Sequence, residues 1–565
     1  MFNRARRRGA PEAPASARVQ ITGMVEAFTE DEVRGWVSVP AESAPTEVEL
    51  RLGAMTVSTT TATPDGAMSA ARRGKHGSQT PSLPSPKGDR RNSRRQIRTF
   101  TFAISQLWEY APKGTPLRVV ADYQVLPIHG HGMFLRAPRS GGKTPEDLQK
   151  QFDEGRLLGR TGLVQVSKQL DEAWQSAVSS LYESTRQVLA DEFGYDLFIT
   201  YGTLLGAVRE GGFLAHDNDY DASFVSSART GPEAADEMVR IAKVLISQGY
   251  RVGAMGGGLH VVDPARPHDR IDIFHVYFDA DGVLQHPFGY AGSQQVTTAQ
   301  WQGTREIEFV GRPALVPVCA EDLLATFYGD DWRLPKTGFK WSVEKRGNDR
   351  TGVMTPPRIT EVYWADYYAH NGHADASSFA RFVDERLGST SGTVIDVGCG
   401  DGRDSIYFAT RGRTVVGLDR AGVAIEHART KAADAHLDRA RFVVCDLADG
   451  EALAEALRAE HERPVVFYSR FVLHAIDAPT QRALQDAIDA RARSGDLFAV
   501  EFRTDKDEAR VKTHPHHYRR YQNASEFLAD LRERGWVVDY DVESAGLAPW
   551  GDEDPVLCRA VARRP

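Results

Sequence analysis

Cysteine, long apolar runs and excess positive charge are all scarce in this sequence of 565 residues. Its four cysteines, Cys319, Cys399, Cys445 and Cys558, show no Cys-x-x-Cys spacing. This pattern excludes a disulfide framework and a cysteine zinc site and favours a reducing compartment, so we expect a cytoplasmic protein. No apolar run reaches the roughly 18 to 20 residues needed to span a bilayer. The formal net charge of −8 argues against bulk binding of nucleic acid, which usually requires a basic excess.

The first residues, MFNRARRRGAPEAPASAR, are basic but no apolar region follows them, so they do not form a secretory signal. We expect a disordered basic tail over residues 1–17. Its arginines, Arg4, Arg6, Arg7 and Arg8, leave two interpretations open. They belong to a plain tail, or they contact anionic lipid at the inner face of the membrane.

The chain is too long for one hydrophobic core, and shifts in composition divide it into blocks. Short alternating runs rich in β-branched residues predict an N-terminal β-sandwich over residues 18–135. This accessory domain, for glycan or partner docking or as a spacer, carries a predicted mobile insert at 63–98, rich in Pro, Ser, Gly and Arg. A linker at 136–164 leads to a middle α/β block at 165–345, and a second linker at 346–360 leads to a C-terminal α/β block at 361–565.

The C-terminal block contains the strand TVIDV, the turn GCGDG, the helix RDSIYFATRG and the strand TVVGLD in succession. Glycines at 398, 400 and 402 let the backbone approach a ligand closely, where a Cβ would collide. Asp419, at the tip of the second strand, is placed to accept hydrogen bonds from ribose hydroxyls. Asp396, before the glycines, can hold an ammonium group, and Asp446, after a third strand, suits an adenine amino group.

These residues resemble the class I S-adenosylmethionine-dependent methyltransferases over residues 361–565. The segment EVYWADYYAH is similar to the family's N-terminal helix, and the end of the chain is similar to its closing antiparallel hairpin. The spacing G-x-G-x-G departs from the G-x-G-x-x-G of nicotinamide enzymes. The resemblance implies a Rossmann-like, seven-stranded sheet and S-adenosylmethionine as cofactor. The cofactor-binding residues that it implies are Asp396, Gly398, Cys399, Gly400, Asp401, Gly402, Asp419, Arg420, Asp446, Leu447 and Arg470.

The methyl acceptor leaves a weaker signature. Methyl transfer needs a general base only if the acceptor is a hydroxyl, and His474, in the loop after the fourth strand, is the catalytic candidate. A packing role is the alternative for this histidine. The later run KTHPHHYRRY, with His514, His516 and His517, suits an anionic acceptor such as a phosphorylated sugar.

The middle block combines a glycine turn with closely spaced carboxylates. The strand LFITY is followed by Gly202 and Thr203, a tight turn into a helix whose amide groups can cradle a phosphate. Asp219 and Asp221 are two residues apart, so in an extended strand they point to the same face. Asp272 lies within the apolar strand RIDIFHVYF, where a charge is costly unless it is paired or bound to metal. We expect these three carboxylates to be catalytic and to bind Mg²⁺ or Mn²⁺.

The runs GTLLGAVREGGFLAHDNDYD and FYGDDWRLPKTGFKW resemble the LicD/fukutin-related phosphotransferase family. The family's usual Trp-Asp-Asp-Asp-Ile-Asp is changed here at His216 and Asn218, which removes one acidic residue. The resemblance implies a nucleotidyltransferase fold that moves a phospho-alcohol from a CDP-activated donor to a glycan hydroxyl. The residues implied to bind the phosphate or the donor are Gly202, Thr203, Arg209, Asp331 and Trp332.

Together the two resemblances imply a bifunctional enzyme that modifies cell-surface polysaccharide, with a CDP-activated alcohol donor, a glycan or lipid-linked glycan acceptor and no nucleic acid. We favour O-methylation of the glycan or its substituent, because nothing in the sequence resembles an aromatic cage for an ammonium acceptor. Two alternatives stay open. The middle block is a true nucleotidyltransferase fused to a small-molecule methyltransferase, or it is a non-catalytic glycan-binding module that presents substrate to the methyltransferase.

Overall fold

The computed structural model describes residues 21–64, 95–139, 141–159, 161–288, 290, 292–335, 352–371, 375–458, 462–510, 512, 518–550 and 553–565. The predicted basic tail, most of the predicted insert, and His514, His516 and His517 lie outside the described residues. Contacts between residues divide the chain into two compact units. The second unit comprises Leu181–Leu197, Ser223–Pro287 and Arg350–Pro565, and the first comprises the remainder.

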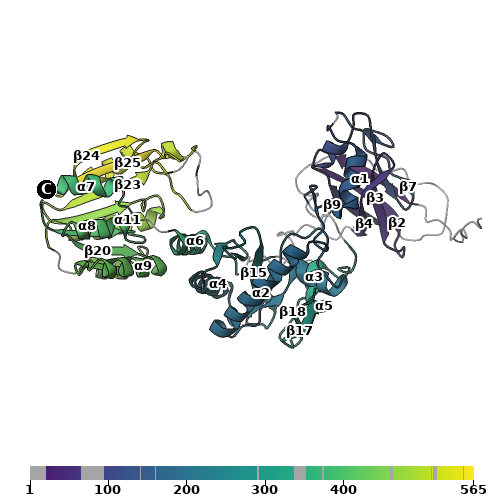
Figure 1. Cartoon of the computed structure of the whole chain (residues 1–565), viewed down its shortest axis with the longest axis horizontal. Coiled ribbons are helices and arrows are strands. Elements are labelled where there is room, and N and C mark those ends of the chain that lie inside the picture. The colour runs from purple at the N-terminus through teal and green to yellow at the C-terminus, as the bar shows by residue number, and fades with distance from the viewer. Residues whose placement is uncertain are drawn as a thin grey trace, which may run out of the picture. The chain divides into compact units, whose positions relative to one another are not determined.

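An antiparallel sheet forms the N-terminal region (Figure 1). Its strands pair in the order β1, β2, β5, β4, β3, β6, β7, with β8 also beside β6. They are β1 (Thr22–Phe28), β2 (Glu32–Pro40), β3 (Thr46–Leu52), β4 (Met55–Pro64), β5 (Arg95–Ala103), β6 (Pro116–Ala121), β7 (Gln124–Val125) and β8 (Leu135–Arg136). Alternate residues of β2 are buried, among them Val33, Val37 and Val39, as its alternating sequence predicts. A 3-10 helix (Leu107–Tyr110), α1 (Pro145–Asp153) and the strand pair β9 (Arg156–Leu158) and β10 (Val164–Val166) complete the region.

The middle region is built around a sheet with the order β11, β12, β15, β14, β13, with β16 paired to β15. Its strands are β11 (Phe198–Ile199), β12 (Asp221–Ser226), β13 (Arg251–Ala254), β14 (Leu259–Val262), β15 (Arg270–Phe278) and β16 (Leu284–Gln285). The helices are α2 (Glu172–Phe193), α3 (Tyr201–Arg209), α4 (Gly231–Ser247) and α5 (Ala320–Tyr328), and β17 (Thr304–Phe309) pairs with β18 (Arg312–Pro317). The predicted strand around Asp272 is confirmed as β15.

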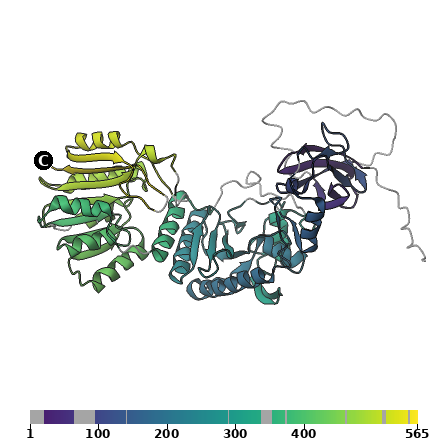
Figure 2. The same cartoon turned by 45° about the horizontal axis from the view of Figure 1, so that its top comes forward.

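The C-terminal region contains a mostly parallel sheet in the order β21, β20, β19, β22, β23, β25, β24, with helices on both faces (Figures 1 and 2). The strands are β19 (Thr393–Val397), β20 (Thr414–Asp419), β21 (Ala440–Val444), β22 (Val465–Arg470), β23 (Leu497–Arg503), β24 (Val537–Ser544) and β25 (Leu557–Arg563). The helices are α6 (Pro356–His370), α7 (Ser378–Leu387), α8 (Arg403–Thr410), α9 (Gly422–Asp434), α10 (Gly450–Arg458), α11 (Ala478–Arg491) and α12 (Ala524–Glu533), with a 3-10 turn at Asp505–Asp507.

Burial explains this layered arrangement. Every residue of β19 is buried, as expected for a central parallel strand covered on both faces. Alternate side chains of its TVIDV run join two separate apolar cores, one containing Ile395 and Val397 and the other containing Val394. The predicted closing hairpin is confirmed, because β24 and β25 pair antiparallel. The parallel strands therefore end together at one edge, where the glycine-rich turn follows β19.

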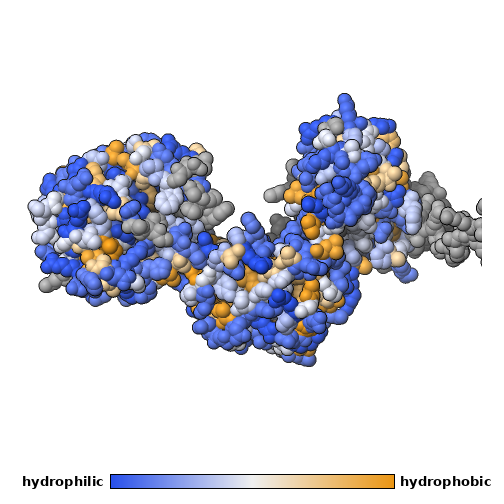
Figure 3. All heavy atoms as spheres, in the orientation of Figure 1, coloured by the Kyte–Doolittle hydropathy of each residue, from blue (hydrophilic) through white to orange (hydrophobic). Residues whose placement is uncertain are grey.

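Among the residues that the structure describes, no helix is both long enough and apolar enough to cross a bilayer. On the face drawn in Figure 3, hydrophilic residues predominate and hydrophobic residues form small, scattered patches.

Candidate functional site

The glycine-rich turn after β19 forms a cradle that only glycine can build. Gly398 and Gly400 have φ angles of 71° and 56°, in the left-handed region that side chains disfavour. A Cβ at position 398 would collide with Val472, and a Cβ at position 400 would collide with the hydroxyl of Tyr368. Positions 398 and 400 therefore require glycine, because the backbone is left-handed there and neighbouring side chains leave no room for a Cβ.

Asp419, at the end of β20, is tied to this turn. Its Oδ2 accepts a hydrogen bond of 2.9 Å from the amide of Gly400, and its Oδ1 accepts one of 2.8 Å from the amide of Ala421. Burial raises the pKa of Asp419, and these hydrogen bonds oppose the rise. The carboxylate therefore holds the turn in place and also faces the cavity described below.

Asp396, just before the glycines, is the most perturbed carboxyl group at this edge. Burial raises its pKa to about 8, with a further contribution from Asp404, while a 2.6 Å hydrogen bond from Ser405 opposes the rise. Asp404 is itself held by Ser377, whose amide and hydroxyl both donate at 2.7 Å. A perturbed carboxyl in a cavity is a candidate for ligand binding, because a bound cation would restore its charge.

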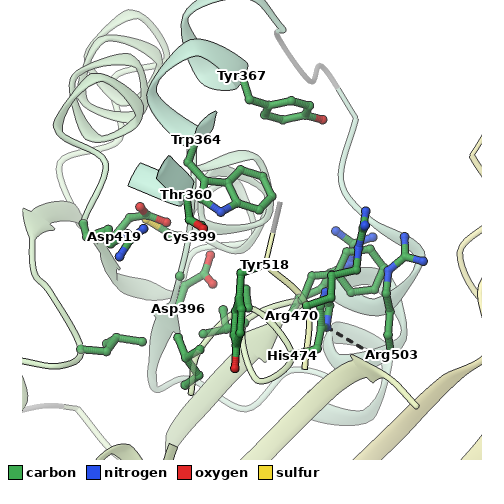
Figure 4. A pocket seen from close by; sticks show the side chains of 18 of the residues that line it. Thr360, Trp364, Tyr367, Asp396, Cys399, Asp419, Arg470, His474, Arg503 and Tyr518 are labelled. Atoms are coloured by element: carbon green, nitrogen blue, oxygen red, sulfur yellow. Dashed lines mark hydrogen bonds between the residues drawn. The ribbon is translucent and has the colours of Figure 1, made fainter. Parts of the chain in front are cut away.

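A cavity of about 870 Å³ opens at this edge of the C-terminal sheet (Figure 4). A volume of this size accommodates a drug-sized ligand together with a second small group. Most of the residues predicted to bind the cofactor line it, namely Asp396, Gly398, Cys399, Asp401, Asp419, Arg420, Asp446, Leu447 and Arg470. The other two, Gly400 and Gly402, shape the turn without lining the cavity.

Helix α6 supplies an aromatic wall that the sequence reading missed. Tyr363, Trp364, Tyr367 and Tyr368 all line the cavity, and Figure 4 shows Trp364 and Tyr367 projecting from this helix. Phe471, Tyr518 and Trp550 add further rings from other segments. The residues predicted from the sequence to line the cofactor site included none of these rings. The signal was present in the sequence, since the run YWADYY spaces its aromatic residues to share one helical face.

Arg470, at the end of β22, brings a buried positive charge to the cavity wall. Its Nε lies 2.9 Å from Glu501, a fully buried carboxylate that also binds the Nε of Arg559 at 2.6 Å. Burial opposes the charged form of Arg470, but Glu501 and Asp404 together raise its pKa. The guanidinium also stacks over Phe471, whose φ is 62°. The sequence did not signal Glu501 as a partner.

His474 lies in the loop after β22, as predicted, and it lines the cavity. Its Nδ1 accepts a 3.2 Å hydrogen bond from the amide of Arg503, drawn in Figure 4. This hydrogen bond fixes the neutral ring with its proton on Nε2. In this tautomer the ring presents a donor rather than an acceptor to any further partner.

Three carboxylates converge in the middle region, as the sequence predicts. Oxygen atoms of Asp219, Asp221 and Asp272 all lie within 4.8 Å of one another. Asp221 begins β12, which pairs with β15, the strand that carries Asp272. Asp219 precedes β12 instead of lying within an extended strand. An all-oxygen set of this kind suits Mg²⁺ or Mn²⁺, so the residues present fit the predicted ion.

Asp272 has two basic neighbours that the sequence reading did not identify. The Nδ1 of His260 lies 2.6 Å from its Oδ1, and the Nε of Arg270 lies 3.2 Å from the same oxygen. Asp272 stands directly opposite His260 in the pairing of β14 and β15. These contacts orient the carboxylate and partly balance its charge.

The predicted phosphate cradle occupies the first turn of α3. The helix begins at Tyr201, so Gly202 and Thr203 lie inside it rather than in a turn before it. The amide of Gly202 donates to Oδ2 of Asp221 at 3.1 Å, and the hydroxyl of Thr203 accepts from the amide of Asp221 at 2.8 Å. A Cβ at Gly202 would collide with Asp217, so the carboxylates approach this helix closely.

The remaining predicted donor residues lie at the ends of α3 and α5. Arg209 closes α3, pairs with Glu210 at 3.0 Å and donates to the carbonyl of Trp332 at 3.3 Å. Trp332 is buried and Asp331 is partly exposed in the turn after α5. These contacts give Arg209 and Trp332 a structural role, and their binding to the donor stays a prediction.

A parallel sheet with a glycine-rich turn after one central strand and an acidic residue at the tip of the next defines a nucleoside-binding α/β domain. Residues 394–495 match the family model for a methyltransferase domain. Residues 194–318 match the family model for the LicD/FKTN/FKRP nucleotidyltransferase domain. The chain therefore carries a LicD-type domain in its middle and a methyltransferase domain at its C-terminal end, as the sequence predicts.

One curated relative is a 2-heptyl-1-hydroxyquinolin-4(1H)-one methyltransferase of Mycobacteroides abscessus, 42% identical over 62 residues. That match covers 11% of this chain and only 27% of the relative's length. Among solved structures, the chain is similar to the glycopeptide N-methyltransferase MtfA at 19% identity, with 34% of this chain and 97% of that chain covered and a TM-score of 0.28. TehB from Haemophilus influenzae is similar at 14% identity, with 36% and 67% covered and a TM-score of 0.28.

Proposed function

We propose that this chain is a bifunctional transferase. Its C-terminal domain transfers a methyl group from S-adenosylmethionine, and its middle domain transfers a phospho-alcohol from a CDP-activated donor to a glycan hydroxyl. The observation that carries the first activity is the glycine cradle tied to Asp419 beside a cavity that also contains Asp396. The observation that carries the second is the convergence of three carboxylates beside the first turn of α3.

Each chemical group of S-adenosylmethionine can be matched to residues of the C-terminal cavity. Asp419 would hold the ribose hydroxyls, and Asp396 would hold the ammonium group of the methionine portion. Trp364 and Tyr368 offer rings that can cover a planar base or shield the sulfonium from water. The donor supplies an activated methyl group, so the protein has mainly to position the acceptor in line and exclude water.

The basic residues of the cavity favour a methyl acceptor that carries a negative charge. Arg503 lines the cavity but is already paired with Asp507 at 2.9 Å and with Glu553 at 2.5 Å. Arg519 also lines the cavity, and its buried Nε has no hydrogen-bond partner among the residues that the structure describes. A phosphate or carboxylate of the acceptor would satisfy this donor. A phosphorylated glycan, the product class of the middle domain, meets this requirement.

A small aromatic acceptor is a second candidate. The ring-lined cavity supports it, and the curated relative from Mycobacteroides abscessus is named for methylation of a hydroxyquinolone. With its proton on Nε2, His474 would orient an acceptor oxygen by donating to it and would not remove the proton of a hydroxyl, so an acceptor that is already ionised fits this residue best.

In the middle domain, Asp219, Asp221 and Asp272 would hold Mg²⁺ or Mn²⁺, which neutralises the diphosphate of the donor. His260 and Arg270 keep Asp272 oriented toward the other two carboxylates. Gly202 and Thr203, which contact Asp221 through their amide and hydroxyl, would lie beside the donor phosphate. We further infer a cytoplasmic site of action and an accessory role for the N-terminal β domain, expected to be a sandwich.

Two assays test the two activities separately. With CDP-alcohols and Mg²⁺, the full chain should release CMP, and Asp219→Ala should abolish this release while sparing methyl-donor binding. Asp281→Ala, an exposed aspartate in the hairpin between β15 and β16, is the matched control and should keep both. Release of pyrophosphate from CTP or ATP, with no reaction of any CDP-alcohol, would instead establish a true nucleotidyltransferase. A non-catalytic glycan-binding middle domain would give neither product.

The acceptor is tested with labelled S-adenosylmethionine. Methyl transfer to a phosphorylated glycan, lost in Arg519→Gln, would support the leading candidate. Transfer to a hydroxyquinolone that does not depend on Arg519 would favour the small aromatic acceptor.

A further inference from the structure

Helix α6 contacts two parts of the molecule through opposite faces. One face carries Thr360, Tyr363, Trp364 and Tyr367, at positions i, i+3, i+4 and i+7, and all of them line the methyl-donor cavity. The opposite face is directed at α4 and β13 of the middle region, beside which α6 lies in Figure 1. Helix α6, α4, β13 and the C-terminal sheet all belong to one compact unit.

The contact with α4 includes two ion pairs. Arg358, in the first turn of α6, donates from Nε to Asp236 at 2.6 Å. Lys243, in the last turns of α4, lies 2.5 Å from Glu361. Each pair is only partly exposed on at least one side, so solvent screens it less than an open surface pair.

The contact with β13 is centred on Asp366. Its Oδ1 accepts a 2.8 Å hydrogen bond from the amide of Val252, and its Oδ2 lies 2.9 to 3.0 Å from the guanidinium of Arg251. Asp366 is 8% exposed. A buried carboxylate that loses these partners carries a large desolvation cost, so Asp366 resists separation of α6 from β13.

On the side of the C-terminal domain, α6 packs against α9. A small second cavity of about 210 Å³ lies between α4, α6 and the start of α9, lined in part by Trp364, Arg420 and Gly422. A hydrogen bond of 3.4 Å joins Arg420, just after β20, to the carbonyl of Pro357 at the start of α6. Three ion pairs thus anchor α6, which carries the aromatic wall of the methyl-donor cavity, to the middle region.

We propose that α6 is a positioning element through which the middle domain sets the affinity of the C-terminal cavity for its methyl donor. Asp236 and Arg251, which do not line the cavity, then act on it through α6 as positioning residues. By reciprocity, a bound donor strengthens the contact of α6 with β13. The inference rests on the proposed methyltransferase function, because it requires the cavity to bind S-adenosyl compounds.

The test measures binding of S-adenosylhomocysteine to the full chain by isothermal titration. Asp236→Asn and Arg251→Gln should each weaken binding by about fivefold to tenfold, the size expected when one charged hydrogen bond is lost from a supporting contact. Arg240→Gln is the matched control, because Arg240 is an exposed arginine of α4 that pairs only with Glu237 of the same helix among the ion pairs described. It should bind as the wild type does.

A second control separates positioning from general loss of stability. Arg534 bridges Asp486, Asp489 and Asp530 within the C-terminal domain and does not line the cavity. Arg534→Gln should lower the melting temperature and leave the affinity unchanged. A residue-specific readout is hydrogen exchange of the Val252 amide, which donates to Asp366 and should slow when S-adenosylhomocysteine is added.

Wild-type affinity in folded Asp236→Asn and Arg251→Gln, or equal weakening by Arg534→Gln, would overturn the positioning role while leaving the proposed methyltransferase intact. Unchanged exchange at Val252 on ligand addition would also overturn it. Absence of wild-type binding would remove the proposed function itself, and the positioning role with it.

Discussion

Methyl-donor binding should depend on pH through Asp396. Its pKa of about 8 means that roughly nine in ten molecules carry the proton near pH 7. If the ammonium group of the donor binds beside the ionised carboxylate, binding near neutral pH must first expel this proton. The dissociation constant should then fall about ninefold between pH 6 and 7 and about fivefold more between pH 7 and 8.

The sign follows from the surroundings of this carboxyl group. Burial and Asp404 raise its pKa, Asp419 adds to the rise, and Ser405 and Arg470 oppose it. Because the folded pKa lies above the ordinary value of 3.8, the free protein loses stability as pH rises from about 4 to about 8. A cationic ligand reverses part of this loss, so affinity and ligand-induced stabilisation should both increase over the same range.

The assay is isothermal titration with S-adenosylhomocysteine between about pH 6 and 8, in two buffers of different ionisation enthalpy. Near pH 7 the complex should release about 0.9 proton per ligand, and Asp396→Asn should bind weakly with no pH dependence. A flat dissociation constant with no proton release in the wild type would refute the assignment of Asp396 to the ammonium group.

Three further predictions address the cradle, the cavity wall and the metal site. Gly400→Ala should weaken S-adenosylhomocysteine by about tenfold or more in titration, because φ is positive and Tyr368 is too close, whereas Gly422→Ala, with open space around it, should not. Glu501→Gln should lower the free energy of unfolding by about 3 to 5 kcal/mol in urea melts, because it leaves two arginines without their buried partner, and a loss under about 1 kcal/mol would contradict the account. Chelation by EDTA should abolish CMP release as Asp219→Ala does, with methyl-donor binding unchanged in both, and persistence of CMP release without metal would exclude the carboxylate site.

Local sequence patterns were sufficient for much of the C-terminal domain. The strand TVIDV is wholly buried, and the strand TVVGLD ends at Asp419. Both were predictable because a buried parallel strand is a continuous apolar run and a glycine-rich turn directly follows it in the sequence. The three carboxylates of the middle region were also predictable. Asp219 and Asp221 lie two residues apart in the sequence, and Asp272 stands out as a charge within an apolar strand.

Features that depend on tertiary pairing could not be read in this way. His260 meets Asp272 only because β14 pairs with β15 in one register, and Glu501 meets Arg470 only because β23 lies beside β22. The docking of α6 on β13 joins Asp366 to Val252 across 114 positions of sequence. The aromatic run in α6 was visible in the sequence, but its direction, toward the cavity, follows from that docking.

The most direct test of the central claim is titration of the full chain with S-adenosylhomocysteine in the wild type and in Asp419→Ala. Saturable binding of one ligand per chain, weakened at least about tenfold by the substitution, is the result that the cradle and its two hydrogen bonds to Asp419 predict. No binding by the folded wild-type protein, or equal affinity in Asp419→Ala, would contradict the assignment of this cavity to a methyl donor.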